Sequence, residues 1–225
     1  MKFLLDEARA RDVETRLAAR LTPDPHADPA LDNAYRITTI YCDTSGFEVF
    51  HRLGPHRRRK YRLRRYGSES LVFLERKTRQ AERVRKRRTM VDDRDLPALS
   101  AFSTDSGWPG HWFHQQLLRR RLEPVCAVRY LRTAYVGTED EGPLRLTFDR
   151  DLRTCLARDW ALPPAACGIS VLTGQVVCEF KFRGALPALF KGVIRELALE
   201  PTGVSKYREG FRAAGGGSNG SLGHA

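Results

Sequence analysis

The feature that most constrains this chain is a strand-like alternation in which apolar residues occupy one side and cationic residues the other. Residues two apart share a face of a β-strand. In Lys60–Arg64, the apolar Tyr61 and Leu63 alternate with Lys and Arg. Leu144–Asp149 and Cys178–Phe182 alternate similarly, with Arg, Lys and a few acidic or Thr residues on the polar side. The chain is therefore expected to form antiparallel strands with one basic face.

The remaining sequence predicts an α+β fold in which helices pack against antiparallel strands. Strands are expected near residues 35–44, 57–66, 71–79, 83–91, 125–136, 143–152 and 175–183. Amphipathic helices are expected near residues 6–21, 95–102, 111–122 and 186–199. Residues 1–212 are predicted to form one domain, and the Gly/Ser-rich residues 213–225 are predicted to be a disordered tail.

The charge balance indicates a polyanionic partner. Lys and Arg number 39 against 27 Asp and Glu, which gives a net charge of +12. Two cations about 6 Å apart repel by about 3 kcal/mol at an effective dielectric constant near 20. A face that collects many Lys and Arg with few carboxylates is expected to take up anions. Arg binds phosphate through paired hydrogen bonds and Lys binds it as a point charge.

The cysteine pattern and the hydropathy indicate an intracellular protein. The five cysteines are scattered and form no CxxC pair, so reduced, mostly buried thiols are expected. No apolar run approaches the roughly 20 residues that would span a bilayer, and the N-terminus lacks a signal-peptide pattern. The predicted location is the cytoplasm.

Three patterns allow a different interpretation. A polar strand face commonly meets only water. Arg57-Arg58-Arg59-Lys60 resembles a nucleic-acid patch. A solvated start to a strand, with Lys60 turned to the basic face, is favoured instead, so nucleic acid is not an expected partner. His111 and His114 have a zinc-like spacing without a nearby third ligand, which favours a structural or surface role.

Seven segments, including the alternating strand segments described above, resemble the VTC domain, the polyphosphate polymerase domain of the vacuolar transporter chaperone complex. Each matching segment is short, and the seven occur in the family's order from about residue 2 to residue 210. They are Ile40–Thr44, Lys60–Gly67, Val72–Lys77, Arg129–Tyr135, Leu144–Asp149, Glu179–Phe182 and Val204–Tyr207.

The resemblance implies a triphosphate tunnel fold, an antiparallel barrel related to the CYTH phosphatases. It also implies transfer of the γ-phosphate of ATP to a polyphosphate chain with the help of a divalent cation, Mn²⁺ or Mg²⁺. Phosphoryl transfer depends mainly on positioning and on neutralising charge. The expected partners are therefore ATP or another triphosphate and polyphosphate, whereas the oligomeric state stays open.

Motif positions carry the implied roles to individual residues. The predicted catalytic cations are Arg62, Arg64, Lys77, Arg145 and Lys206. The predicted phosphate-binding residues are Lys2, Lys60, Lys86, Arg88, Arg132, Lys181 and Ser205. Glu179 matches the family's metal-binding glutamate, and Glu75 and Asp149 are further candidate metal ligands.

Two segments depart from the family pattern. Met1 stands directly before Lys2, where the family usually has another charged residue, and Gly203-Val204 precede Ser205, where the family often has a lysine. Three functions consequently stay open: a polyphosphate polymerase, a triphosphatase or polyphosphatase of the same fold, and a non-catalytic polyanion-binding module.

Overall fold

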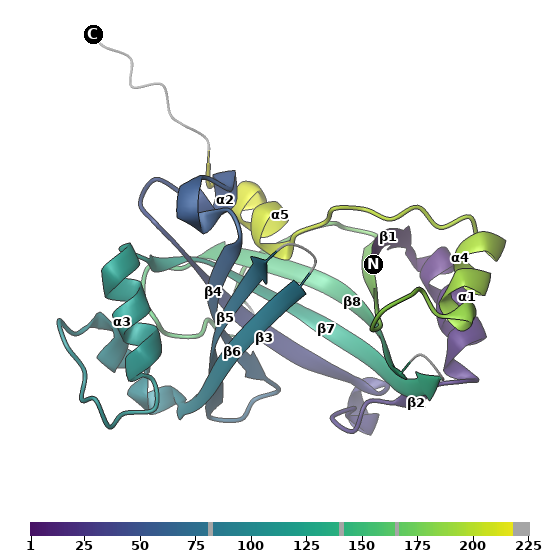
Figure 1. Cartoon of the computed structure of the whole chain (residues 1–225), viewed down its shortest axis with the longest axis horizontal. Helices are drawn as coiled ribbons and strands as arrows, with labels where there is room; N and C mark the ends of the chain where they lie inside the picture. The colour runs from purple at the N-terminus through teal and green to yellow at the C-terminus, as the bar shows by residue number, and fades with distance from the viewer. Residues whose placement is uncertain (81–82, 140–141, 165–166, 218–225) are drawn as a thin grey trace, which may run out of the picture. The chain divides into compact units, whose positions relative to one another are not determined.

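The computed structural model describes residues 1–80, 83–139, 142–164 and 167–217, which form two compact units that interleave along the chain (Figure 1). The first unit contains residues 1–36, 130–152 and 172–205. The second contains residues 37–129, 153–171 and the chain from residue 206 onward. Strands β7 (Glu123–Glu139) and β8 (Gly142–Leu156) contribute residues to both units.

The first unit is an antiparallel sheet with two helices. Its strand order is β1-β10-β8-β7, and the short β2 pairs with β7. Its remaining elements are β1 (Lys2–Asp6), α1 (Glu7–Ala18), β2 (Thr22–Pro23), η1 (Pro29–Leu31), β10 (Gln175–Lys181) and α4 (Ala188–Glu196). Figure 1 shows α1 and α4 beside each other, in agreement with their contacts.

The alternation of the strands decides which face of this sheet is buried. Phe3, Phe148 and Phe180 are inaccessible to solvent and form the core with apolar residues of α1 and α4. Helix α1 supplies Ala10, Val13 and Leu17 at helical spacing. Replacing one such phenylalanine by alanine costs about 3–5 kcal/mol. The helices therefore cover the apolar face and leave the polar face of β8 and β10 to other contacts.

The second unit has a longer antiparallel sheet. Its strands follow the order β7-β3-β4-β5-β6, and β9 pairs with β8. The elements are β3 (Ala34–Asp43), α2 (Glu48–His51), η2 (Gly54–His56), β4 (Arg59–Tyr66), β5 (Leu71–Gln80), β6 (Arg83–Asp92), η3 (Asp93–Ser100), α3 (His111–Arg120), β9 (Ile169–Ser170) and α5 (Lys206–Ala213).

Helix α3 covers the apolar face of β4 and β5. Tyr61 is buried there and packs edge-on against Phe113, while its hydroxyl bonds to Gln116. Leu63 and Leu74, which are paired across the two strands, are fully buried on the same side. The basic side chains between these residues consequently point to the opposite face, as the alternation predicts.

The predicted strands and helices are confirmed with shifted ends, and several segments differ, among them β1, which the sequence did not predict as a strand. Residues 93–100 form a 3₁₀ helix, because in an α-helix the ring of Pro97 would clash with the carbonyl four residues earlier. The sequence reading placed no helix at residues 206–213, where α5 forms by burying Tyr207, Gly210 and Phe211. The tail prediction falls partly on residues 218–225, which lie outside the described residues.

The antiparallel sheet with helices confirms the predicted fold class. Among the described residues, the strand order within each unit is open at its ends, so neither unit by itself is a closed barrel. No helix in the described part of the chain is long and apolar enough to cross a membrane.

Candidate functional site

Three neighbouring strands of the second unit place a row of lysines on one face. The register pairs Lys60 of β4 with Lys77 of β5, and Lys77 with Lys86 of β6. Adjacent strands are about 4.8 Å apart, so these side chains belong to one patch. Three ammonium groups at this spacing repel one another and favour an anion placed among them.

The next row of the same face contains two arginines around one carboxylate. Arg62, Glu75 and Arg88 lie opposite one another on β4, β5 and β6. The Nε atom of Arg62 donates to Glu75 over 2.7 Å, and Lys86 pairs with the other carboxylate oxygen. Burial alone would raise the pKa of Glu75, whose side chain is 1% exposed, but the charges of Arg62, Arg64 and Lys86 lower it to about 2. Glu75 therefore stays ionised.

The pKa values of Tyr41, which is buried, and Tyr66, which is partly buried, show how positive this face is. Burial would raise the pKa of Tyr41, yet the charges of Arg62, Arg64, Lys60 and Lys206 lower it. Tyr66 behaves in the same way beside Arg64. A field that stabilises phenolate will also stabilise phosphate oxygens. We define this set, Lys60, Arg62, Arg64, Glu75, Lys77, Lys86 and Arg88, as the lysine-row face.

Lys206 joins this environment from helix α5, where a buried aspartate fixes the start of the helix. Tyr207 donates from its hydroxyl to Oδ2 of Asp43 over 2.5 Å, and Asp43 also accepts from the backbone N–H groups of Val49 and Phe50. Burial and the Asp43 charge raise the pKa of Tyr207 strongly. Asp43 thus holds the residue that follows Lys206, although its role was not predicted from its place in the Ile40–Thr44 segment.

The polar face of the first unit combines arginines with buried carboxylates. Arg132 donates from Nε and Nη2 to the two oxygens of Asp149 over 2.6 and 2.8 Å, and both side chains are buried. Burial would lower the pKa of Arg132, but Asp149 raises it above its ordinary value. Arg132 is thereby fixed in one orientation.

Arg145 is held by two residues that the sequence analysis did not select. Its Nη2 atom lies 2.6 Å from Oδ2 of Asp24, which is 2% exposed, and 3.0 Å from the hydroxyl of Tyr35. Asp24 lies in a proline-rich loop, so no periodic pattern marks it. Only its contact with β8, over a hundred positions along the chain, reveals its role.

Lys181, Glu179 and Lys2 complete this second set. Lys181 lies opposite Arg145, and Glu179 lies opposite Lys2. Burial, aided by the charges of Arg132 and Arg145, lowers the pKa of Lys181 to about 8, against the effect of Glu179. Lys2 donates to the carbonyl of Val204 over 3.1 Å. We define Lys2, Asp24, Arg132, Arg145, Asp149, Glu179 and Lys181 as the paired-arginine face.

The structure therefore gathers the predicted cations on two faces, one in each unit. Ser205 is buried and belongs to the first unit, whereas Lys206 belongs to the second. Convergence of the two sets on one cavity stays a prediction of the sequence.

Comparison with known proteins decides the family. The VTC domain model matches residues 1–214, which is nearly the whole chain. The chain belongs to the VTC domain family. No protein of curated function matches it.

Two solved structures share the fold of this VTC domain. One is a candidate adenylate cyclase from Bacillus halodurans, with a TM-score of 0.56 and 13% identity over 92% of this chain and 94% of the other. The second is a candidate adenylyl cyclase from Hippeastrum, HpAC1, described as having a dominant triphosphatase activity. Its TM-score is 0.53 and its identity 14%, over 96% of this chain and 94% of the other. At such identities the likeness concerns the fold alone.

The carboxylates of this VTC domain differ in how well they suit a divalent cation. Both oxygens of Asp149 contact Arg132, and those of Glu75 contact Arg62 and Lys86. Glu179 is partly exposed and lies 3.8 Å from the ammonium group of Lys181. No group of three His, Cys, Asp or Glu is placed to hold a metal ion within the described residues. Mg²⁺ often takes one or two carboxylates and completes its coordination with substrate phosphates, and Glu179 fits that use.

The remaining patterns of the VTC domain are structural. The rings of His111 and His114 contact Thr104, and His114 also contacts the carbonyl of Ala101, which ties the loop before α3 to the helix. Arg59 points to the other face of the sheet from Lys60, and Arg85 and Arg87 point to the other face from Lys86. The charges of β4 and β6 are therefore divided between the two sides of the sheet.

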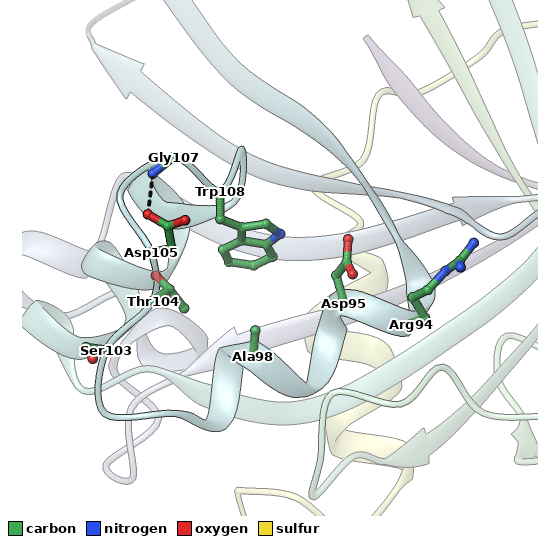
Figure 2. Close-up of a pocket in the computed structure, with 8 residues that line it drawn as sticks. All are labelled: Arg94, Asp95, Ala98, Ser103, Thr104, Asp105, Gly107 and Trp108. Atoms are coloured by element: carbon green, nitrogen blue, oxygen red, sulfur yellow. Dashed lines mark hydrogen bonds between the residues drawn. The ribbon is translucent and has the colours of Figure 1, made fainter.

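A surface depression of about 620 Å³ lies away from the lysine row, between η3 and the loop that leads to α3 (Figure 2). It contains Arg94, Asp95, Asp105 and Trp108, and Asp105 accepts a hydrogen bond from the N–H of Gly107 within it (Figure 2). Because acidic residues outnumber basic ones in this lining, the depression does not suit a phosphate chain.

Proposed function

We propose that this VTC domain is a metal-dependent phosphotransferase that transfers the γ-phosphate of ATP to a polyphosphate chain in the cytoplasm. The observation that carries the proposal is the lysine-row face, where six cations surround one carboxylate. The cations of such a face repel one another, and a bound polyanion would relieve this repulsion. Membership in a family whose fold relatives handle triphosphates supports phosphate as that anion.

In this proposal the chain's residues bind and orient phosphates rather than form covalent intermediates. Arg62, Arg64, Lys77, Arg145 and Lys206 act as the catalytic cations, because fixed positive groups stabilise the charge that spreads over the transferring phosphoryl. Rigid strands hold most of them, so little reorganisation accompanies the reaction.

The other predicted residues bind the remaining phosphates or orient these cations. Lys2, Lys60, Lys86, Arg88, Arg132, Lys181 and Ser205 are proposed as phosphate-binding residues. Glu179 would hold the Mn²⁺ or Mg²⁺ ion, which supplies Lewis-acid neutralisation of phosphate oxygens when bound. Glu75 and Asp149, whose oxygens contact cations, are proposed to position Arg62 and Arg132 rather than to bind metal.

The test is incubation of the protein with ATP and Mn²⁺ while long polyphosphate and free phosphate are measured together. Polymerase activity predicts long chains that are lost in Glu179→Gln, with Glu196→Gln, an exposed carboxylate paired with Arg16, as the matched control. Absence of chains under every divalent cation would reject the polymerase.

A triphosphatase is the second candidate, and the activity described for HpAC1 favours it. In that case water replaces the polyphosphate end as acceptor, and free phosphate is released without chain growth. A non-catalytic binder would show neither product, and its salt-dependent polyphosphate binding would persist in Glu179→Ala.

A further inference from the structure

Two of the five cysteines form a pair that the phosphate chemistry does not use. Cys155 near the end of β8 and Cys167 just before β9 are both partly exposed, and the Cys167 side chain adds to the effect of burial in raising the pKa of Cys155. Cys42, Cys126 and Cys178 are buried instead. All five are free thiols.

The backbone around the pair is held in place. The register joins Thr154 to Ile169. The nearby Gly168 has a φ of +107°, and a Cβ there would lie 2.6 Å from the carbonyl oxygen of Thr154, so the position requires glycine. Arg153 donates to the carbonyl of Gly168 over 2.9 Å. The two segments that carry the thiols are therefore in close contact.

Arg129 reinforces this arrangement from β7. Its Nη1 atom donates to the carbonyls of Pro164 and Cys167 over 2.8 and 3.0 Å. Burial raises the pKa of Cys155 to about 11, while the Arg129 charge acts in the opposite direction. A disulfide joins residues whose Cα atoms are about 4.4–6.8 Å apart, a range that neighbouring antiparallel segments can meet.

We propose that Cys155 and Cys167 form a reversible intramolecular disulfide when the protein meets a hydroperoxide. Peroxide oxygen first converts one thiolate to a sulfenic acid, and water leaves. The second thiolate then attacks the sulfenic sulfur, forming the S–S bond and releasing a second water after protonation. Overall, two thiols and one hydrogen peroxide give one disulfide and two waters.

The disulfide would restrain the end of β8, which contacts helix α5. Thr154, next to Cys155, contacts Gly210 so closely that a Cβ on Gly210 would lie 2.9 Å from its Oγ1. Closing the loop between the two cysteines restricts the unfolded chain. Oxidation is expected to raise Tm by about 5 °C and to slow hydrogen exchange in residues 154–156, 167–170 and α5.

The experiment oxidises the full chain with hydrogen peroxide, blocks remaining thiols with an alkylating reagent and maps the peptides by mass spectrometry. The expected product is a Cys155–Cys167 cross-linked peptide that dithiothreitol removes, together with the reversible rise in Tm. Cys155→Ser and Cys167→Ser should each abolish both effects while leaving circular dichroism unchanged.

Separate alkylation of both cysteines after oxidation, or a disulfide between two copies of the chain, would overturn the proposal. So would a Tm rise that persists in both serine variants. These outcomes need no assumption about catalysis, so they are independent of the ATP and Mn²⁺ experiment.

Discussion

The lysine-row face and the paired-arginine face balance their positive charge in different ways. In the first unit, Arg132 and Arg145 each contact a buried carboxylate, Asp149 and Asp24 respectively. In the second unit, Glu75 is the one carboxylate among six cations in the rows defined by the β4–β6 register. One face is largely neutralised by the protein itself, whereas the other retains an excess of positive charge.

This difference indicates that one face orients its arginines, whereas the other attracts an anion. A buried ion pair contributes little net stability, but it fixes a guanidinium in one orientation. An excess of cations costs stability in the free protein and is relieved when an anion binds. The comparison suggests that the paired-arginine face supplies geometry and the lysine-row face supplies affinity.

The largest effect is expected at the Arg132–Asp149 pair. Asp149→Asn leaves the buried Arg132 charge without its carboxylate and should lower the free energy of unfolding by about 3–5 kcal/mol. Urea denaturation measures this loss. The double variant Arg132→Met with Asp149→Leu should recover most of it, and a double variant as unstable as Asp149→Asn would contradict the positioning role.

The decrease in the free energy of unfolding at acid pH should depend on Glu75. Its pKa lies at about 2 in the folded protein, below the ordinary value of 4.5. A lowered folded-state pKa gives stability that is present above pH 4.5 and lost as the pH falls toward 2. One pKa unit is about 1.4 kcal/mol, so the loss is about 3 kcal/mol.

Urea midpoints of the wild type and Glu75→Gln between pH 7 and pH 2.5 test this dependence. The glutamine variant should be less stable at pH 7 and should show a flatter acid limb. Parallel acid limbs in the two proteins would show that Glu75 does not hold the lysine-row face together.

A smaller effect is expected from the two residues that hold Arg145. Asp24→Asn removes the carboxylate and should weaken tripolyphosphate binding about tenfold, which is about 1.4 kcal/mol, because Arg145 loses its orientation. Tyr35→Phe removes one hydrogen bond and should cost about 1 kcal/mol or less. Isothermal titration calorimetry orders the two variants, and a larger loss in Tyr35→Phe would reverse the assignment.

The sequence predicted which face of each strand is basic because alternation is a local property. Arg62, Arg64, Lys181 and Glu179 lie where period-two spacing placed them. It did not predict Asp24, Tyr35 and Asp43 as partners, since those contacts join segments distant along the chain. Helix α5 was also missed, because its short apolar stripe precedes a glycine-rich tail.

Opposite faces of the same three strands allow the most direct test of the phosphate-binding claim. One triple variant replaces Lys60, Lys77 and Lys86 with alanine, and the matched control replaces Arg76, Arg85 and Arg87, which the register places on the other side. Both lose three charges, and tripolyphosphate affinity is measured by calorimetry. We predict a loss of at least about a hundredfold for the lysine triple and less than about threefold for the arginine triple. Equal losses in the two variants, or a larger loss in the arginine triple, would contradict a phosphate site on the lysine-row face.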